Sequence, residues 1–442
     1  MKNFNYKNFR SYYFVGIGGI SVSALAEFLF NNGFKVKGSD LSNNNCVKKL
    51  KKLKITVYDT HRFENITDVD VLVYSSAIDN LNPEIIEAKR QNIPTVCRSE
   101  LLGSILADFN NVLAVAGSHG KTTTTAMLTE VFASIYNPTA FIGGESITYG
   151  NYKFGERDFC ITEACEYQKN LLNIKPTVSI LLNADYDHVD TYKNVYEVAS
   201  TFKTFSLNTV CIKNADDVYL NDIPAKYTFA LTSKADFTAK NIKTTHNGVN
   251  FNLYIKGKKA CKIFIPLFGK HNVLNALSVI AAAIYLNVPL SKIKTALASF
   301  KGINRRNELL GKYINTTFYA DYAHHPKEII KAINLPSFKS KKTLFIFEPH
   351  TYSRTKILMN DFVDTLIKVK NLAIYKTYPA REPFDLSGDA LTLLNNINAV
   401  KKGKKADYFD DVFKFFNHAI NFDKVVILGA GSLYDDVKRF LN

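Results

Sequence analysis

The 442-residue sequence lacks the features that mark secreted, membrane-spanning and repetitive proteins. Its six cysteines are scattered and none forms a CxxC pair, so we expect reduced thiols and a cytoplasmic protein. No apolar run approaches the roughly 18 to 20 residues that span a bilayer, so we expect no membrane insertion. The apolar stretch near the N-terminus is cut by Gly16, Gly18 and Gly19, which indicates a strand entering a glycine turn and not a signal peptide. We find no internal repeat and no low-complexity segment.

The net charge of +16 comes mostly from lysine, in runs such as Lys48–Lys54 and Lys401–Lys405. Such a charge can attract nucleic acid or a membrane surface. The lysines are spread along the chain, however, and no nucleic-acid module accompanies them. We therefore interpret them as solvated helix faces and expect no nucleic-acid partner. A basic surface also suits an anionic, phosphate-bearing substrate.

The chain length suggests about three domains. Strand-like apolar segments alternate with helical patterns, which predicts parallel sheets with helices on their faces. The predicted strands are 12–18, 34–40, 69–76, 93–96, 111–117, 159–164, 178–184, 317–323, 343–349, 371–377 and 425–431, and the predicted helices are 20–31, 123–136, 272–285 and 290–300. We predict an α/β protein of three successive units, residues 1–107, 108–301 and 302–442, with a β-rich insertion at 226–265.

The clearest motif is GSHGKTTTT, from Gly117 to Thr125, which follows a predicted strand and opens a helix. Glycines let the backbone wrap around phosphate oxygens, and the helix N-terminus supplies N–H groups and a positive dipole end. Lys121 is expected to reach the β- and γ-phosphates and the Thr122 hydroxyl to bind Mg²⁺. A strict Walker A motif has glycine five residues before Gly120, where this chain has Val115, so the match is to the shorter GxxGKT. The predicted phosphate-binding residues are Gly117, Ser118, His119, Gly120, Lys121, Thr122 and Thr123.

A second glycine turn, GIGGIS, occupies residues 16–21 between a predicted strand and helix. It is similar to the dinucleotide fingerprint, with Ser21 in place of the third glycine. Asp40 ends the next strand about 20 residues on, where an acid can meet a ribose hydroxyl. The turn fits NAD, a UDP-type pyrophosphate, or a plain tight turn.

Acidic residues follow two strands of the predicted central sheet. Glu163 and Glu166 come at and after the end of 159–164, and the segment NADYDHVD (183–190) follows 178–184. Ligand sites in open parallel sheets gather at the carboxyl ends of strands, so both groups are expected to face the glycine loop. One or two of these acids would suffice for Mg²⁺ beside phosphate oxygens. Any single one can equally be a solvated loop residue. The polar residues of the second segment are Asp185, Asp187, His188 and Asp190.

The third unit contains ADYAHHP (320–326) and FEPHTYSRT (347–355), each with a histidine in a strand-to-helix connection. A lone histidine is more often structural, but two such loops predict a polar cluster of Asp321, His324, His350 and Arg354. Arg305 and Arg306 lie at the predicted boundary, where guanidinium groups can bind phosphate.

Taken in order, these stretches resemble the Mur ligase family over nearly the whole chain. The resemblance rests on FVGIGGIS, SSAIDNLNPE, IPTVCRSELL, AVAGSHGKTTTT, TEACEY, NADYDHVDTY, FGKHNVLNALSVIAA, FKGINRRNE, DYAHHPKEI, FEPHTYSRT and GAGS. It implies a Rossmann-like UDP-sugar domain, a central P-loop ATPase domain and a Rossmann-like C-terminal domain for the amino acid. DYAHHP and HTYSR point to the branch that joins L-alanine to the lactyl carboxylate of UDP-N-acetylmuramate, using ATP and Mg²⁺, in peptidoglycan precursor synthesis.

The resemblance also implies roles for individual residues. It places Thr122, Glu163 and His188 at Mg²⁺; His271, Asn272 and Asn275 at ATP; and Arg306 and Asp321 at the phosphates and nucleotide. It places Tyr322, His324, His350 and Arg354 in the alanine pocket, with His324 a candidate proton acceptor, and Gly18, Gly19, Ile20, Ser21, Asp40, Ser75 and Ser76 at the UDP-sugar. Departures from the family pattern occur at Ala320, Cys165, Tyr167, Thr351 and Asn307. All except Asn307 affect the predicted alanine pocket and the surroundings of the metal, and every one leaves Lys121, Glu163 and His188 in place.

Three other functions fit parts of the sequence. A ligase that adds a preformed peptide to the same UDP-sugar would keep the first two domains and change the third. An NAD-dependent oxidoreductase would use GIGGIS and leave GSHGKT unexplained. A non-catalytic nucleotide-binding protein would tolerate the loss of Lys121, Glu163 and His188, all of which are present.

Overall fold

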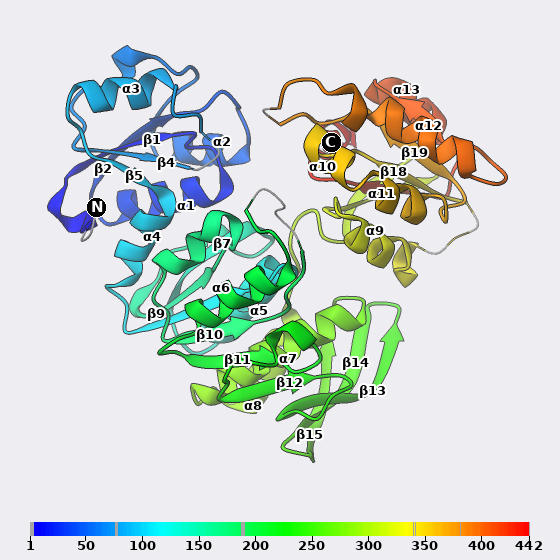
Figure 1. Cartoon of the computed structure of the whole chain (residues 1–442). Coiled ribbons are helices and arrows are strands. Elements are labelled where there is room, and N and C mark those ends of the chain that lie inside the picture. Colours follow the sequence, from blue (N-terminus) through cyan, green and yellow to red (C-terminus); the bar gives the residue numbers. More distant parts are fainter. Residues whose placement is uncertain are drawn as a thin grey trace. The chain divides into compact units, whose positions relative to one another are not determined.

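The computed structural model describes residues 4–75, 78–186, 191–338, 340, 342–380 and 382–441. The chain divides into two compact units, Met1–Gly302 and Ile303–Asn442. The first unit holds two sheets and the second holds one (Figure 1). The predicted α/β fold class, with parallel sheets in three successive regions, is confirmed. The division of the first unit at residue 107 stays a prediction.

The N-terminal sheet is parallel, in the order β3-β2-β1-β4-β5. Its strands are β1 (Ser11–Val15), β2 (Lys35–Ser39), β3 (Thr56–Tyr58), β4 (Val71–Tyr74) and β5 (Thr95–Cys97), and its helices are α1 (Ile20–Asn31), α2 (Asn45–Lys52), α3 (Pro83–Arg90) and α4 (Arg98–Leu106). Figure 1 shows α1 and α3 on opposite faces of this sheet. Because both faces are covered, β1 is a continuous apolar run whose last four residues are fully buried.

The second sheet has ten strands in the order β15-β14-β13-β12-β11-β10-β6-β9-β7-β8. The bounds are β6 (Asn111–Ala116), β7 (Pro138–Ser146), β8 (Gly150–Lys153), β9 (Glu156–Glu163), β10 (Val178–Leu181), β11 (Val210–Asn214), β12 (Tyr227–Ala230), β13 (Phe237–Thr245), β14 (Gly248–Ile255) and β15 (Lys258–Ile265). The strands β6, β7 and β9 to β13 run parallel, and β8 is antiparallel to β7. β14 and β15 are antiparallel, and with β12 and β13 they form the β-rich insertion predicted at 226–265. The helices are α5 (Lys121–Ala133), α6 (Val195–Phe205), α7 (Lys270–Tyr285) and α8 (Leu290–Ser299).

Polar contacts and a shared core join the two sheets of the first unit. The Asn151 side chain of β8 donates hydrogen bonds to the Ile20 carbonyl (2.7 Å) and the Ser23 hydroxyl (2.9 Å) of α1. Arg157 of β9 donates to the side chain of Asn32 at 2.7 Å. One apolar cluster includes residues of both sheets, such as Phe28 and Phe141, whose ring centroids lie 5.7 Å apart.

The second unit contains a six-stranded sheet in the order β16-β17-β21-β18-β19-β20. The strands are β16 (Glu308–Tyr313), β17 (Thr316–Asp321), β18 (Thr343–Phe347), β19 (Leu372–Tyr375), β20 (Asp407–Phe409) and β21 (Lys424–Leu428), and only the β16–β17 pairing is antiparallel among the described strand pairs. The helices are α9 (Pro326–Ile333), α10 (Tyr352–Ile357), α11 (Met359–Leu366), α12 (Ala390–Val400), α13 (Val412–Ala419) and α14 (Leu433–Leu441). Six short 3₁₀ segments complete the described secondary structure: η1 (Tyr6–Asn8), η2 (Phe63–Asn65), η3 (Tyr167–Asn173), η4 (Val218–Leu220), η5 (Pro336–Phe338) and η6 (Leu386–Gly388).

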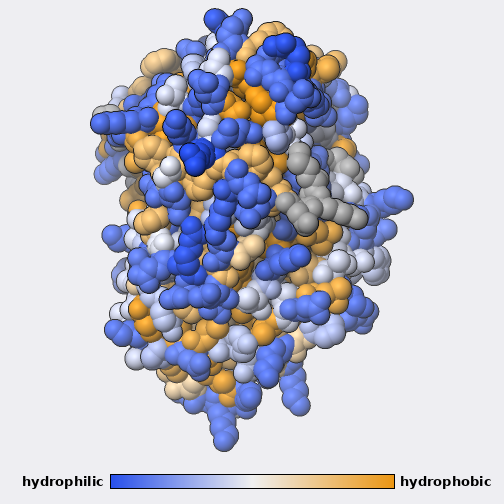
Figure 2. Space-filling model, turned by 90° about the vertical axis from the view of Figure 1, so that its left-hand side faces the viewer, coloured by the Kyte–Doolittle hydropathy of each residue, from blue (hydrophilic) through white to orange (hydrophobic). Residues whose placement is uncertain are grey.

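The visible surface is mainly hydrophilic, with smaller apolar patches between the polar side chains (Figure 2). Lys48, Lys51 and Lys52 of α2 are exposed, as the interpretation of that lysine run as a solvated helix face requires. In the part of the chain that the structure describes, every helix is too short or too polar to span a lipid bilayer.

The glycine turn after β21 is occupied by a buried carboxylate of the same unit. Glu348, just past the end of β18, accepts hydrogen bonds from the backbone N–H groups of Ser432 (3.1 Å) and Leu433 (3.2 Å) at the start of α14. A Cβ atom at Gly431 would lie 2.6 Å from this carboxyl group, which explains the glycine there. Burial raises the pKa of Glu348 to about 7, although the two N–H donors act in the opposite direction.

This raised pKa predicts a stability that falls with pH. The ordinary value is 4.5, so between that pH and about 7 the folded state holds a proton that the unfolded chain has lost. The stabilisation from the protonated carboxyl is complete below the unfolded pKa and is lost as pH rises through the folded one, by up to about 3 kcal/mol. Glu348→Gln stays neutral at both pH values. Its stability relative to the parent protein should therefore be higher at pH 8 than at pH 5. Thermal unfolding of the full chain at both values measures this, with the exposed Asp364→Asn as control. An equal difference in stability between Glu348→Gln and the parent protein at both pH values would contradict the raised pKa of Glu348.

Candidate functional site

The loop between β6 and α5 has the geometry that its glycines predict. Gly117 has φ +143° and Gly120 has φ +87°, both in the region that favours glycine. α5 begins at Lys121, two residues before the predicted start, because the left-handed Gly120 serves as its N-cap. The first turn of a helix leaves backbone N–H groups without intrahelical acceptors, so this loop presents donors suited to phosphate oxygens.

The segment that follows β10 fixes this loop in place. Asn183 accepts from the His119 N–H at 2.8 Å and donates to the His119 carbonyl at 2.9 Å. The Ser118 hydroxyl accepts from the Asp185 N–H at 2.9 Å, and His119 Nε2 lies 3.2 Å from Asp185 Oδ2. The prediction that the NADYDH segment faces the glycine loop is therefore confirmed for residues 183–185. Asp187, His188 and Asp190 lie outside the described residues.

The Lys121 ammonium is enclosed by oxygen atoms. It donates to the carbonyl of Gly117 at 2.6 Å and lies 2.9 Å from Glu166 Oε2. Burial by itself lowers the pKa of Lys121, but Glu166, Cys165 and Glu163 together outweigh that effect and raise it above the ordinary value. The lysine is therefore a fixed cation at the mouth of the loop. Sequence reasoning considered Glu166 as a metal ligand, and the structure shows it paired with Lys121.

Glu163 lies beside the Thr122 hydroxyl, as the predicted Mg²⁺ site requires. Its Oε1 accepts from the Gly143 N–H at 2.6 Å, and a Cβ atom at residue 143 would lie 2.4 Å from the carboxylate. Burial raises the pKa of Glu163, while Lys121, the Thr122 hydroxyl and the Gly143 N–H lower it. A carboxylate and a hydroxyl at a phosphate loop are donors that suit Mg²⁺. Within the described ranges no three His, Cys, Asp or Glu side chains form a metal site, and His188 falls outside those ranges.

The start of α7 lies against the glycine loop. A Cβ atom at Gly120 would be 2.8 Å from Asn275 Oδ1. Asn275 donates to Asn272 Oδ1 at 3.2 Å, and Asn272 donates to the Phe268 carbonyl at 2.8 Å and lies 3.1 Å from His271 Nε2. The structure thus brings together the predicted ATP-binding residues of two segments that are about 150 residues apart in the sequence.

The GIGGIS turn lies at the carboxyl ends of β1 and β2. Its Gly18 N–H donates to Asp40 Oδ2 at 2.8 Å, and Asp40 Oδ1 accepts from the Ser42 N–H and hydroxyl. Asp40 therefore holds the turn itself, which the sequence did not indicate. Gly19 is the N-cap of α1, so Ile20 and Ser21 form its first turn. Ser75 follows β4 at the same sheet edge, and Ser76 lies outside the described residues.

The predicted polar cluster of the second unit is present. His324 and His350 have ring centroids 5.9 Å apart, and Tyr322 packs edge-on against His324 at 5.3 Å. Arg354 Nη1 lies 3.1 Å from His350 Nδ1. The predicted nucleotide residue Asp321 accepts from the N–H groups of Asn307 and Ala323, both at 3.0 Å. Burial raises the pKa of Asp321, and Arg306 opposes that effect.

The two neighbouring arginines have different surroundings. Arg305 donates to the Gly431 carbonyl at 3.2 Å and to Asp435 at 2.8 Å, so it stabilises the turn after β21. The guanidinium of Arg306 lies over the Tyr322 ring at 5.1 Å and has Nη1 3.9 Å from Glu328 Oε1. Arg306 thus belongs to the histidine cluster. Glu328 was missed by sequence reasoning, although its place two residues after His-Pro in the first turn of α9 was a usable signal.

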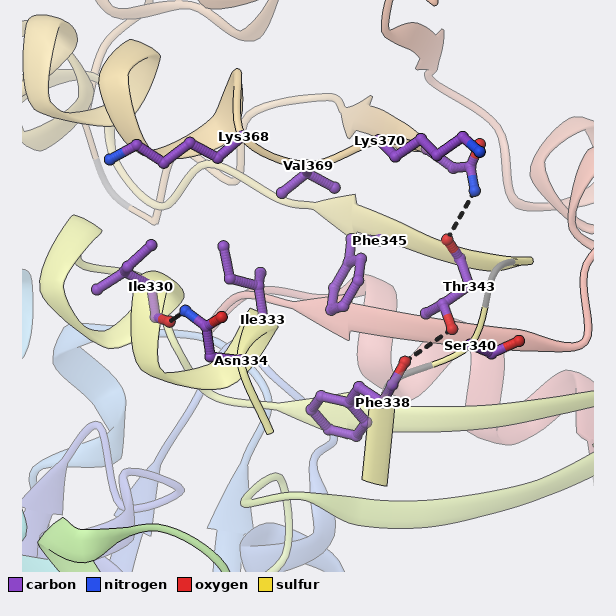
Figure 3. A pocket seen from close by; sticks show the side chains of 11 residues that line it. Ile330, Ile333, Asn334, Phe338, Ser340, Thr343, Phe345, Lys368, Val369 and Lys370 are labelled. Atoms are coloured by element: carbon purple, nitrogen blue, oxygen red, sulfur yellow. Dashed lines mark hydrogen bonds between the residues drawn. The ribbon is translucent and has the colours of Figure 1, made fainter. Parts of the chain in front are cut away.

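A separate hollow of about 650 Å³ lies at the amino end of β18. Figure 3 shows Ile333, Phe345 and Val369 around it, with Lys368 and Lys370 on its rim. The described lining residues are Ile330, Ile333, Asn334, Phe338, Ser340, Thr343, Phe345, Lys368, Val369, Lys370 and Asn371. None of these was predicted as a site residue. The histidine cluster instead follows the carboxyl ends of β17 and β18, where ligands bind in sheets of this kind.

These features define a P-loop nucleotide-binding protein built on parallel sheets. The family description "Mur ligase family, catalytic domain" matches residues 11–110, and "Mur ligase middle domain" matches residues 115–283. The UDP-N-acetylmuramate–L-alanine ligase of Clostridium acetobutylicum is 37% identical over 97% of each chain, and that of Aquifex aeolicus is 37% identical over 98% of this chain and 97% of its own. The chain belongs to the Mur ligase family.

A solved structure agrees with this membership. The UDP-N-acetylmuramate–alanine ligase MurC of Thermotoga maritima has a TM-score of 0.86 with 28% identity. The match covers 97% of this chain and 98% of that one. The similarity therefore extends over both compact units and is not confined to the glycine loop.

The loop geometry predicts that Gly120→Ala weakens nucleotide binding. The substitution places a Cβ atom 2.8 Å from Asn275 Oδ1 and imposes strain at φ +87°. We expect about tenfold weaker ATP binding, measured by titration with a fluorescent ATP analogue. Gly33→Ala is the matched control, because Gly33 has φ +86° with nothing within 4 Å. If both variants bind ATP as the parent protein does, the loop does not hold the nucleotide.

Proposed function

We propose that this chain joins L-alanine to the lactyl carboxylate of UDP-N-acetylmuramate, converting ATP to ADP and phosphate. The observation that carries the proposal is the enclosed Lys121 ammonium in a glycine loop, with Glu163 beside Thr122. Such a site suits phosphoryl transfer, and the curated relatives are named for this ligation. The protein works in the cytoplasm and supplies a peptidoglycan precursor.

The reaction begins with a phosphoryl transfer. A lactyl carboxylate oxygen attacks the γ-phosphorus, the bond to ADP breaks, and an acyl phosphate forms. Two anions must approach each other, so charge neutralisation dominates this step. Lys121 supplies fixed positive charge, and Arg306 is assigned to the same task. Thr122, Glu163 and His188 would hold Mg²⁺, which supplies further positive charge at the phosphates when it is bound.

The second step forms the amide. The amine of L-alanine attacks the acyl carbon, and phosphate leaves from the tetrahedral intermediate. The ammonium must first lose a proton, for which a neutral histidine at His324 is suited. The pKa of His324 is lowered by burial, although Glu328 opposes that effect, so the ring is available as an acceptor at neutral pH. Tyr322, His350 and Arg354 are assigned to alanine.

The remaining assignments concern the nucleotides. The GIGGIS turn, with Gly18, Gly19, Ile20 and Ser21, is assigned to the UDP pyrophosphate because its α1 N-terminus presents backbone donors. Asp40 supports this turn, and Ser75 and Ser76 are assigned to the same substrate. His271, Asn272 and Asn275 are assigned to ATP through their place at the glycine loop.

Removal of the Lys121 charge tests the proposal. Lys121→Ala should reduce alanine-dependent ADP release by about 100-fold or more, because fixed charge at the transferred phosphate is lost. The assay contains UDP-N-acetylmuramate and ATP, with L-alanine, other amino acids or a tripeptide as acceptors. Lys203→Ala, on the exposed side of α6, is the control and should retain full activity.

Each outcome separates the competing functions. ADP release with the tripeptide but not with L-alanine would indicate the peptide-adding reaction. NAD binding without ADP release would indicate an oxidoreductase. An unchanged rate in Lys121→Ala would refute the phosphoryl-transfer scheme.

A further inference from the structure

The histidine cluster of the second unit contains a carboxylate that the reaction scheme does not yet use. Glu328, in the first turn of α9, accepts from the backbone N–H of His324 at 3.3 Å, and its Oε2 lies 3.5 Å from His324 Nδ1. Its other oxygen lies 3.9 Å from Arg306. The side chain is 16% exposed, so its charge is only partly screened by water. The inference below rests on the proposed function.

The hydrogen bonds of His350 determine which of its nitrogens carries a proton. Arg354 can only donate, so His350 Nδ1, 3.1 Å from Arg354 Nη1, must accept. The proton of the neutral ring is therefore on Nε2, which is a hydrogen-bond donor. Burial lowers the pKa of His350 to about 3, and the adjacent His324 and the Arg354 guanidinium act in the same direction, so the ring stays neutral at working pH.

The surroundings of His324 give the opposite arrangement. Its Nδ1 lies 2.9 Å from the Tyr322 carbonyl, which can only accept. Nδ1 therefore carries the proton, and Nε2 is left as an acceptor. The two histidines thus offer one acceptor and one donor within the same cluster. An amino acid needs this pair, because its ammonium donates and its carboxylate accepts.

We propose that Glu328 is a positioning residue for the amine step, which holds His324 with Nε2 as acceptor and stabilises the imidazolium that forms there. One proton passes from the alanine ammonium to Nε2, and the freed nitrogen lone pair attacks the acyl carbon. As the C–O bond to phosphate breaks, the second amine proton leaves with the phosphate. His350 Nε2–H and Arg354 donate to the alanine carboxylate.

The charges around His324 explain why a carboxylate is needed. Arg354 on α10 and Arg306 before β16 both oppose a positive charge on the ring, whereas Glu328 favours it. Asp321, at the end of β17, is bound to backbone N–H groups. Tyr322 and His350 also face the ring, and Tyr378 stacks on His350. Without Glu328, proton transfer to His324 would place a cation near two guanidinium groups.

Two nucleophiles separate this role from a structural one. Alanine must lose a proton before it attacks, whereas hydroxylamine is largely unprotonated at neutral pH and attacks the acyl phosphate directly. In Glu328→Gln we expect alanine-dependent amide formation to fall about tenfold or more, with hydroxamate formation within about twofold of the parent protein. The acidic limb of the alanine rate should move to lower pH, because loss of the carboxylate lowers the pKa of His324. Glu328→Asp should recover part of the rate.

The control and the double variant complete the test. Lys331→Gln, exposed on the same helix, should leave both rates unchanged. His324→Asn keeps a donor for the Tyr322 carbonyl and removes the basic nitrogen that takes the proton, so adding Glu328→Gln to it should cause no further loss. If Glu328→Gln loses rate equally with L-alanine and with hydroxylamine, Glu328 acts through Arg306 on the phosphate step, and the proposal is overturned. Additive losses, or an unchanged alanine rate, would also overturn it. If the parent protein releases no ADP with UDP-N-acetylmuramate and hydroxylamine, the proposed function itself fails.

Discussion

The candidate catalytic region depends on one buried cation. The Lys121 ammonium is 15% exposed by side chain and is held between the Gly117 carbonyl and the nearly inaccessible Glu166 carboxylate. A buried ammonium requires such partners, since an unpaired charge in this environment is strongly unfavourable. Asn183 binds the glycine loop at His119, which keeps the loop and its Gly117 carbonyl in place before any nucleotide binds. The positive charge is therefore preorganised, and binding does not have to assemble it.

A second constraint is the direction of the strands. In parallel sheets the carboxyl ends of neighbouring strands lie at one edge, and the loops with the binding and catalytic residues lie at that edge. β6 leads into the glycine loop, β9 ends at Glu163, and β10 leads to Asn183. In the second unit, β17 ends at Asp321 and β18 leads to His350. The apolar hollow at the amino end of β18 lies at the other edge, away from these residues.

Much of this arrangement could be predicted from the sequence, because strand and loop motifs have local causes. GSHGKT follows a buried apolar strand and precedes a helix, so the loop and its location were both readable. Contacts that depend on tertiary packing were not. Nothing local indicates that Glu166 pairs with Lys121, that Asp40 binds the Gly18 N–H, or that Glu348 occupies the turn after β21. The place of Glu328 after His-Pro was readable, but its importance was not, because that depends on the tautomers of two histidines from different loops. The roles of the predicted site residues stay predictions.

The central claim is that the carboxylate of the UDP-sugar is activated by phosphorylation. The most direct measurement uses UDP-N-acetylmuramate labelled with ¹⁸O in the lactyl carboxylate, with ATP and L-alanine, and analyses the released phosphate by mass spectrometry. An acyl phosphate intermediate transfers one carboxylate oxygen to phosphate, so the account predicts one ¹⁸O atom in each phosphate formed. Phosphate without label would mean that ATP is hydrolysed by water and would contradict the account.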